Sequence, residues 1–322
     1  MKRNPSMTEE DWRWFELSRA ARGLSAAQIK SLERQLRSNQ TDLDVRIQLF
    51  SYYRDRCLTS RKYSDSETKL FEHVLWIIEN KPDLGSSMGH SLAMTSNRFK
   101  PKNFASLREA WLEKVTANPL NASILGNAAS FIAWRDLEIA ADLFERAHAL
   151  QPEAAWLQLL VMHCNSQLSY FPFYYRNEIC ERIIEAGSRS LNTEFAGAPF
   201  LTCEYVSEAA LFLGQYDVVR WCAEMLPEWG PTCEQMANAY LGLVALRENN
   251  RALAIEMLAV KRGYFPQRVV LRLARELFDL GERESIIRLI KDFKSKIKAS
   301  IRNHWIEQIS NDELPDFESF CC

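Results

Sequence analysis

The stretch DLEIAADLFERAHALQP, residues 136–152, decides the fold. Its apolar residues recur at helical spacing, and the small side chains of Ala140 and Ala147 share a helix face with the large ring of Phe144. Two explanations are open: the helix lines a cofactor pocket, or a second helix crosses closely at the two alanines. Because this face carries no polar anchor for a cofactor, the pattern favours the close packing of two helices.

The composition indicates a helical globular protein. The chain has 322 residues, 47% of them hydrophobic, but only 11 glycines. Average usage of about 7% would give roughly twice as many glycines, and sheet-rich or Rossmann-like folds need them in hairpins and phosphate loops. The formal net charge of −2 gives no global electrostatic reason to bind nucleic acid or an anionic membrane. We therefore expect neither as a partner.

The cysteines and the N-terminal residues bear on compartment and cofactors. None of the eight cysteines forms a C-x-x-C pair, and most lie within apolar helical patterns. The five histidines are too scattered for a metal site, and no phosphate-binding loop is present. The N-terminal residues lack the apolar core of a signal peptide. We expect a cytoplasmic protein without metal or other cofactor.

Three prolines indicate a repeat. Helical segments end at Pro82, Pro119 and Pro152 in the similar sequences IIENKP, VTANP and HALQP. Their separations, 37 and 33 residues, lie in the range of helical repeat proteins. A helix-turn-helix unit is therefore expected to recur along the chain.

Start and turn signals agree with this unit. Ser25 with Gln28, and Thr41 with Asp44, have the spacing of a capping box at a helix start. Towards the C-terminus, three further hairpins are expected to turn at polar or glycine positions: Gly214, Asn249 with Asn250, and Gly281. Hairpins of this kind cannot bury both faces alone, so they must stack.

Residues 121–152 resemble the tetratricopeptide repeat. The small, large and proline positions of that family's signature hold Ala128, Ala140, Ala147, Phe131, Phe144 and Pro152. Asn127 departs from it, because the family has a large aliphatic residue there. The resemblance implies an all-α, right-handed superhelical solenoid of six or seven stacked antiparallel hairpins. We expect an N-terminal cap with the first hairpins in residues 1–82, the repeat array in 83–310 and an acidic tail in 311–322.

The resemblance also implies a binding surface, because the first helix of each repeat lines the concave side of such an array. The corresponding residues are Ala122, Leu125, Ala129, Ile132, Trp156, Leu159 and His163. This groove is apolar and lacks the Lys/Asn/Arg clamp with which some members hold a C-terminal carboxylate. It suits an amphipathic helix or a hydrophobic segment of a partner protein. Alternatively, turns or the tail of the chain itself cover the groove.

Two segments break the repeat pattern. Residues 169–176 crowd five aromatic rings around Pro172, which favours either a loop pinned onto the array or a rigid patch that holds a peptide. The terminal Cys321 and Cys322 resemble the double-cysteine ends that are prenylated in Rab-type proteins, although the GTPase fold is absent. The alternative for this pair is an unstructured, reactive tail.

One motif points to catalysis. Residues 85–89, GSSMG, match the nucleophile pattern G-x-S-x-G, with Ser87 in the nucleophile position and His90 beside it. That motif needs a strand before the serine and a helix after it. Because a helix ended by Pro82 precedes it here, we interpret the segment as a turn and a helix start.

The last feature is a basic amphipathic helix expected over residues 288–302. Its cationic residues are Arg288, Lys291, Lys294, Lys296, Lys298 and Arg302. Such a helix either caps a helical array or binds a membrane or nucleic acid. The acidic net charge favours the cap. Taken together, the sequence predicts a non-enzymatic scaffold that binds a protein or peptide in the concave groove; the alternative is a nucleic-acid- or membrane-associated regulator acting through this helix.

Overall fold

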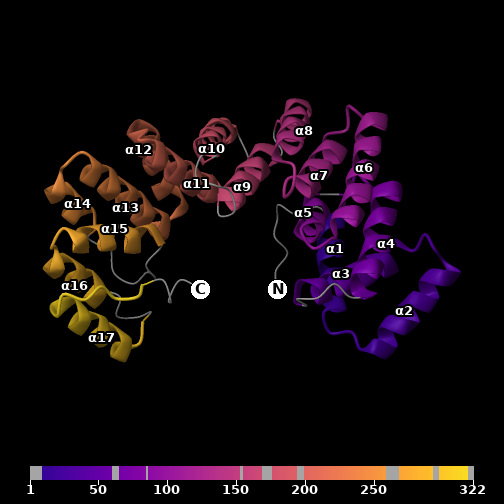
Figure 1. Cartoon of the computed structure of the whole chain (residues 1–322), viewed down its shortest axis with the longest axis horizontal. Coiled ribbons are helices and arrows are strands. Elements are labelled where there is room, and N and C mark those ends of the chain that lie inside the picture. Colours follow the sequence, from indigo (N-terminus) through magenta and orange to yellow (C-terminus); the bar gives the residue numbers. More distant parts are fainter. Residues whose placement is uncertain are drawn as a thin grey trace. The chain divides into compact units, whose positions relative to one another are not determined.

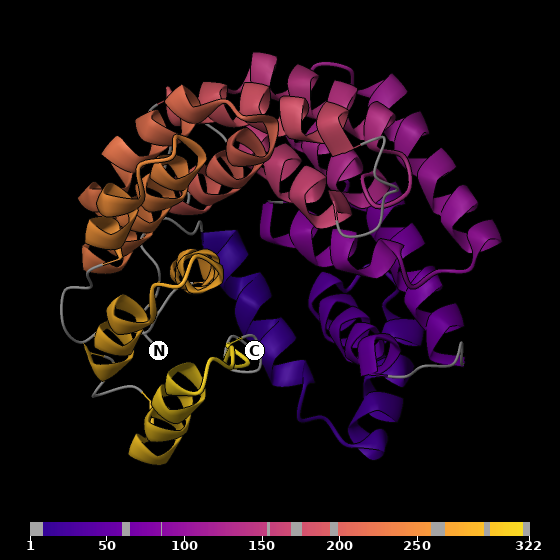
Figure 2. The ribbon, with the colours of Figure 1, turned by 60° about the vertical axis from the view of Figure 1, so that its left-hand side comes forward.

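The chain folds into helices grouped in two compact units. The computed structural model describes residues 9–59, 65–84, 86–152, 155–168, 176–193, 199–258, 268–292 and 297–317, without the side chains of residues 10, 11, 86–88 and 90. All elements in these ranges are helices, so the all-α prediction is confirmed (Figures 1 and 2). The N-terminal unit comprises Met1–Ser169 with Thr193–Gly197, and the C-terminal unit Tyr170–Asn192 with Ala198–Cys322. The expected boundaries after residues 82 and 310 stay predictions.

The N-terminal unit contains nine helices among its described residues. Helix α3 packs against α4 and α7 against α8, while α5 packs against α7 and α4 against α6. The helices are α1 (Glu9–Ala21), α2 (Ala26–Ser38), α3 (Leu43–Thr59), α4 (Asp65–Asn80), α5 (Ser86–Ser96), α6 (Pro101–Ala117), α7 (Ala122–Ile132), α8 (Leu137–Leu150) and α9 (Trp156–Leu168).

The stretch that opens the analysis forms α8 and behaves as a packed helix. The side chain of Asp136 caps it by accepting a hydrogen bond from the amide of Ile139 at 3.3 Å. Ala140, Phe144 and Ala147 have no exposed surface. Their burial confirms the close-packing explanation, since α8 contacts both α7 and α9.

Only one of the two predicted helix starts is correct. Ser25 and Gln28 form the expected capping box at α2: the Ser25 hydroxyl accepts from the Gln28 amide, and the Gln28 side chain accepts from the Ser25 amide. At α3 the capping side chain is Asp42, which accepts from the Val45 amide at 3.1 Å. The prediction of Thr41 was wrong because α3 starts one residue later than that cap requires; the Thr41 hydroxyl instead donates to the Asn39 side chain.

The C-terminal unit is a succession of helix pairs. Contacts join α10 to α11, α11 to α12, α13 to α14, α15 to α16 and α16 to α17. The bounds are α10 (Arg176–Leu191), α11 (Pro199–Leu213), α12 (Tyr216–Met225), the 3-10 helix η2 (Leu226–Trp229), α13 (Pro231–Arg247), α14 (Arg251–Met257), α15 (Arg268–Asp279), α16 (Arg283–Asp292) and α17 (Ala299–Ser310).

Four helices of this unit end in the same turn. A residue with positive φ follows each of α11, α13, α15 and α17: Gly214 (74°), Asn249 (61°), Gly281 (89°) and Asp312 (66°). The next amide in each case donates to the carbonyl five residues back, at 2.8 to 3.0 Å, which is the Schellman arrangement. The three predicted turns are confirmed, and the fourth is new. Their separations of 35, 32 and 31 residues give the unit a structural period.

Ion pairs join successive turns of this unit. Arg220 contacts Glu248 at 2.5 Å, Arg251 Nε contacts Glu282 at 2.5 Å, and Arg283 Nε contacts Asp312 at 2.7 Å. The partners in each pair are 28, 31 and 29 residues apart, close to the period of the turns. Exposed pairs of this kind contribute little to stability, roughly 0 to 1 kcal/mol each. They show that one hairpin meets the next in a repeated way.

The late basic helix is not continuous, so that prediction was wrong. Helix α16 ends at Asp292, and α17 begins at Ala299 after an extended residue, Lys298. Ile297, which lies between the two helices in the chain, is buried, as are Leu289 and Ile290 of α16. Lys294 and Lys296 lie outside the described residues.

The C-terminal tail folds back onto the last helices. Asp312 pairs with Arg283 at the start of α16. Phe317 is 6% exposed, and its ring meets Trp305 of α17 edge-on at 5.1 Å. Residues 318–322, with Cys321 and Cys322, lie outside the described residues, and so do residues 169–175 of the aromatic segment. In the part of the chain that the structure describes, no helix is both long and apolar enough to cross a lipid bilayer.

Candidate binding surface

The residues predicted to line the groove are mostly buried. Leu125, Ala129 and Ile132 have no exposed surface, Trp156 is 4% exposed and His163 is 9% exposed; Ala122 and Leu159 are half-buried. Every residue from Ile124 to Ile132 in α7 is buried, because this helix packs against α5, α6, α8 and α9. Ala122 and Leu159 are therefore the two of the seven that keep some surface for a partner.

Trp156 and His163 have packing roles in the N-terminal unit. A Cβ atom placed on Gly126 would lie 2.1 Å from the Trp156 ring, so this ring lies directly against the backbone of α7. The His163 ring stacks on Phe144 at 5.9 Å and meets Trp134 edge-on at 6.0 Å. Both rings fill space between α7, α8 and α9.

Asn127, the residue that departs from the repeat pattern, explains how α7 becomes enclosed. Its amide group donates to the carbonyls of Pro82 at 3.0 Å and Leu84 at 2.6 Å. A Cβ atom on Gly89 would lie 2.2 Å from the Asn127 side-chain oxygen, so α5 approaches α7 closely at this point. A large aliphatic residue could neither satisfy these carbonyls nor allow the glycine contact. The departure in the sequence marks the place where α5 docks.

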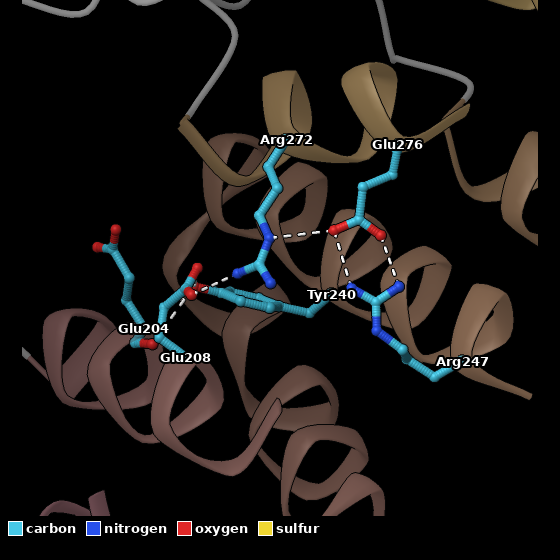
Figure 3. Close-up of polar contacts among 6 residues, drawn as sticks. All are labelled: Glu204, Glu208, Tyr240, Arg247, Arg272 and Glu276. Atoms are coloured by element: carbon cyan, nitrogen blue, oxygen red, sulfur yellow. Dashed lines mark hydrogen bonds and ion pairs between the residues drawn. The ribbon is translucent and has the colours of Figure 1, made fainter. Parts of the chain in front are cut away.

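A different surface is accessible in the C-terminal unit. It lies on α11, α13 and α15, the first helices of three successive pairs. Figure 3 shows five of its side chains joined by hydrogen bonds and ion pairs. We call it the inner-helix surface. Its members are Glu204 and Glu208 on α11, Arg247 on α13, and Arg272 and Glu276 on α15, with the buried Tyr240 of α13 beneath them.

Arg272 is the centre of this surface. Its Nη1 donates to Glu208 Oε2 at 2.7 Å, and its Nε donates to Glu276 Oε1 at 3.3 Å (Figure 3). The first contact joins α15 to α11, although α13 lies between them in the chain and packs against both. A single arginine can bridge two helices separated by a third only if they approach each other on that face. Arg272 and Glu208 are 38% and 39% exposed, so the bridge is open to solvent.

Tyr240 lies beneath the bridge. It has no exposed surface, and its hydroxyl donates to Glu208 Oε1 at 3.2 Å and lies 3.3 Å from the backbone carbonyl of Glu204. Burial, together with the negative charges of Glu208 and Glu204, raises the pKa of Tyr240 well above its usual value. The phenol therefore stays neutral and holds the Glu208 carboxylate in place as a hydrogen-bond donor.

The opposite end of the surface is a two-point ion pair. Arg247 Nη1 donates to Glu276 Oε2 at 2.6 Å, and Nη2 donates to Oε1 at 2.9 Å. Paired hydrogen bonds of this type fix the orientation of both planar groups. They also raise the pKa of Arg247. Acidic and basic groups thus alternate along the surface in a fixed arrangement.

Glu204 is the exception in this network. No hydrogen bond or ion pair to its carboxylate occurs among the residues that the structure describes, and the side chain points away from the others in Figure 3. Burial and the charge of Glu208 raise the pKa of Glu204, while Arg268 opposes this effect. Its half-buried carboxylate is available to a cationic group.

The sequence did contain a signal for this surface. Glu204 with Glu208 and Arg272 with Glu276 are spaced i,i+4, which places each pair on one face of its helix. What the pattern could not supply is the contact across 64 residues that joins Glu208 to Arg272.

The serine of the nucleophile pattern lies at the start of α5. The element before it is α4, a helix, and no strand occurs among the described residues. The side chains of Ser87 and His90 lie outside the described part of the chain. Among the residues that are described, no group of three or more His, Cys, Asp and Glu side chains is placed to hold a metal ion.

Comparison with known proteins adds no relative. No model of a protein family matches the chain, and neither the curated proteins nor the solved structures contain a significant match.

Proposed function

We propose that the chain is a non-catalytic scaffold, a tetratricopeptide-like array of helix hairpins, that binds a segment of a partner protein on the inner-helix surface. The observation that carries the proposal is the bridge from Arg272 on α15 to Glu208 on α11 across α13, because it fixes partly exposed charges of both signs on one face of the unit. Complementary charges of this kind provide specificity in recognition.

The repeat architecture is supported by the turns of the C-terminal unit. Four Schellman turns at intervals of 35, 32 and 31 residues match the period of helical repeat families. In such arrays the first helices of successive repeats line one face, which is where α11, α13 and α15 carry the alternating charges. The proposal thus keeps the predicted class of function and moves the contact residues from the apolar groove predicted on α7 and α9 to a polar face.

The test uses a displayed library of short peptides selected on the wild-type protein. Affinities of the selected peptides are then measured for Arg272→Glu and for a matched control, Arg220→Glu, which reverses an exposed ion pair at a turn. We expect Arg272→Glu to weaken binding at least tenfold and Arg220→Glu to leave it unchanged. Circular dichroism checks that both variants retain their helices.

A third variant separates this proposal from the groove predicted in the N-terminal unit. Leu159→Glu adds a charge at a half-buried position of that groove. If Leu159→Glu abolishes binding while Arg272→Glu does not, the partner uses the N-terminal groove. Equal affinity of the peptides for all three variants would exclude both surfaces.

A further inference from the structure

The three helices of the inner-helix surface run in the same direction. Gly242 of α13 lies against Leu273 of α15. Further along both helices Arg247 pairs with Glu276, so α13 and α15 are parallel. Helix α11 shares their direction, because the chain reverses between α11 and α12 and again before α13. One turn back along any of the three helices therefore corresponds to one turn back along the other two.

One turn before the bridge, the pairing between α11 and α15 is not repeated. Glu208 and Arg272, which form the bridge, are 64 residues apart in the chain. Glu204 and Arg268 each precede them by one turn, which places these two charges at one level of the surface. Arg268 acts electrostatically on Glu204, in agreement with this placement. Among the described residues, however, neither the carboxylate of Glu204 nor the guanidinium of Arg268 forms a hydrogen bond or an ion pair.

The same part of α13 carries a buried amide without a partner. Gln235 is 8% exposed, and within the described part of the chain neither its side-chain oxygen nor its side-chain nitrogen has a hydrogen-bond partner. It lies two turns before Gly242, on the side of α13 that faces α15. A buried amide in this state destabilises a fold, so a ligand is one reason to keep it. We call Glu204, Gln235 and Arg268 the unpaired cluster.

The hydrogen-bonding capacity of the unpaired cluster indicates what it binds. Glu204 alone would suit a cationic group, but Arg268 can only donate, and the amide of Gln235 both donates and accepts. A ligand that satisfies all three must therefore present donors and an acceptor together. A side-chain carboxamide does so, because its nitrogen donates twice and its oxygen accepts twice. An ammonium group would leave Arg268 without an acceptor, and a carboxylate would leave Glu204 without a donor.

We propose that the unpaired cluster binds the side-chain amide of an asparagine or glutamine in the partner segment. The nitrogen of that amide donates to Glu204 and to the oxygen of Gln235, and its oxygen accepts from Arg268 and from the nitrogen of Gln235. Because Gln235 has three rotatable side-chain bonds and no hydrogen bond to break, it can turn towards the ligand. The inference rests on the proposed function and adds the kind of side chain that the partner presents.

The test uses the peptides selected on the wild-type protein. In each peptide, asparagine is replaced by leucine or glutamine by methionine, which keeps the size of the side chain and removes its hydrogen bonds. We expect one such replacement to weaken binding to the wild type at least tenfold. Against Gln235→Met the same replacement should weaken binding about threefold or less, since part of the contact is already lost. The matched control is Gln215→Met, at an exposed position whose side chain caps no helix, and it should keep the full effect.

Stability distinguishes a binding role of Gln235 from a structural one. Gln235→Met removes an unsatisfied buried amide, so the urea concentration at the midpoint of unfolding should stay the same or rise while the affinity for the peptide falls. A lower midpoint together with a full effect of the peptide replacement would overturn the role of Gln235. The replacements measured against the wild type do not depend on this variant.

The bridge variant Arg272→Glu separates this inference from the proposed function. If it weakens binding and no replacement of an asparagine or glutamine does, the inner-helix surface binds the partner, but the unpaired cluster does not hold an amide. The inference is likewise overturned if a charged residue of the peptide is required in place of the amide. If Arg272→Glu leaves every affinity unchanged, or the library yields no binder, the proposed function fails and the inference fails with it.

Discussion

His73 predicts how the stability of the N-terminal unit depends on pH. This residue of α4 is 5% exposed, its Nδ1 lies 3.4 Å from a guanidinium nitrogen of Arg46, and its ring stacks on Tyr53 at 5.8 Å. Because Arg46 can only donate, Nδ1 must accept, so the imidazole is neutral. Burial, followed by the charges of Arg46 and Lys69, lowers the pKa of His73 to about 3.

The size of the effect follows from the difference between the two states. In the unfolded chain the pKa of a histidine is about 6.5, so between pH 6.5 and pH 3 the unfolded state binds a proton that the folded state does not. Stability is therefore complete above the unfolded pKa and falls as the pH decreases. Acidification from about pH 7.5 to about pH 5 should cost about 2 kcal/mol through this one group.

The assay is urea unfolding followed by circular dichroism at both pH values. The variant His73→Gln keeps an oxygen that can accept from Arg46 but cannot be protonated in this range, so it should lose about 2 kcal/mol less than the wild type on acidification. His304→Gln, at an exposed position of α17, is the matched control and should behave as the wild type. If His73→Gln and the wild type lose the same free energy, His73 is not held neutral by its surroundings, and the reasoning is refuted.

Three further predictions concern the packing and the turns, and each is tested by the effect of substitutions on the free energy of unfolding. Ala147→Leu should lower the free energy of unfolding by about 1 to 3 kcal/mol, because Ala147 is fully buried. Ala149→Leu, at an exposed position of the same helix, should leave it almost unchanged. Similar losses of stability in the two variants would contradict close packing of α8. Asn127→Leu restores the repeat pattern but leaves two carbonyls without a donor, for a loss of about 1 to 3 kcal/mol, and unchanged stability would mean that water replaces the amide. Gly281→Ala, at φ 89°, should lower the free energy of unfolding by about 1 kcal/mol or more, whereas Asn249→Gly, at φ 61°, should leave it unchanged or raise it. If instead Asn249→Gly destabilised the protein and Gly281→Ala did not, these turns would not require a left-handed backbone conformation.

Local features of the fold could be predicted because each depends on a few neighbouring residues. The spacing of Ala140, Phe144 and Ala147 was sufficient to predict a helix that packs closely, and Gly214 and Gly281 marked turns that only a residue tolerant of positive φ can make. The turn at Asp312 was missed, since aspartate adopts this conformation less often than glycine or asparagine.

The candidate site could not be predicted in the same way, because it depends on contacts between distant segments. The amphipathic pattern of α7 identifies a buried face but not the helix that covers the other face; that information lies in the hydrogen bonds from Asn127 to Pro82 and Leu84. Similarly, the continuous helix expected over residues 288–302 fitted the local periodicity, but α16 ends at Asp292 and α17 begins at Ala299.

The recurring turns of the C-terminal unit show that a structural repeat need not be accompanied by a repeat of residue identities. The same backbone conformation is built by glycine at residues 214 and 281, by asparagine at 249 and by aspartate at 312, and the ion pairs between turns combine different acidic residues. A method that scores residue identities position by position gains little information from such sites, although the geometry is the same at each. Repeats that descend from one duplicated hairpin can therefore keep the same backbone dihedral angles after their amino-acid sequences have diverged.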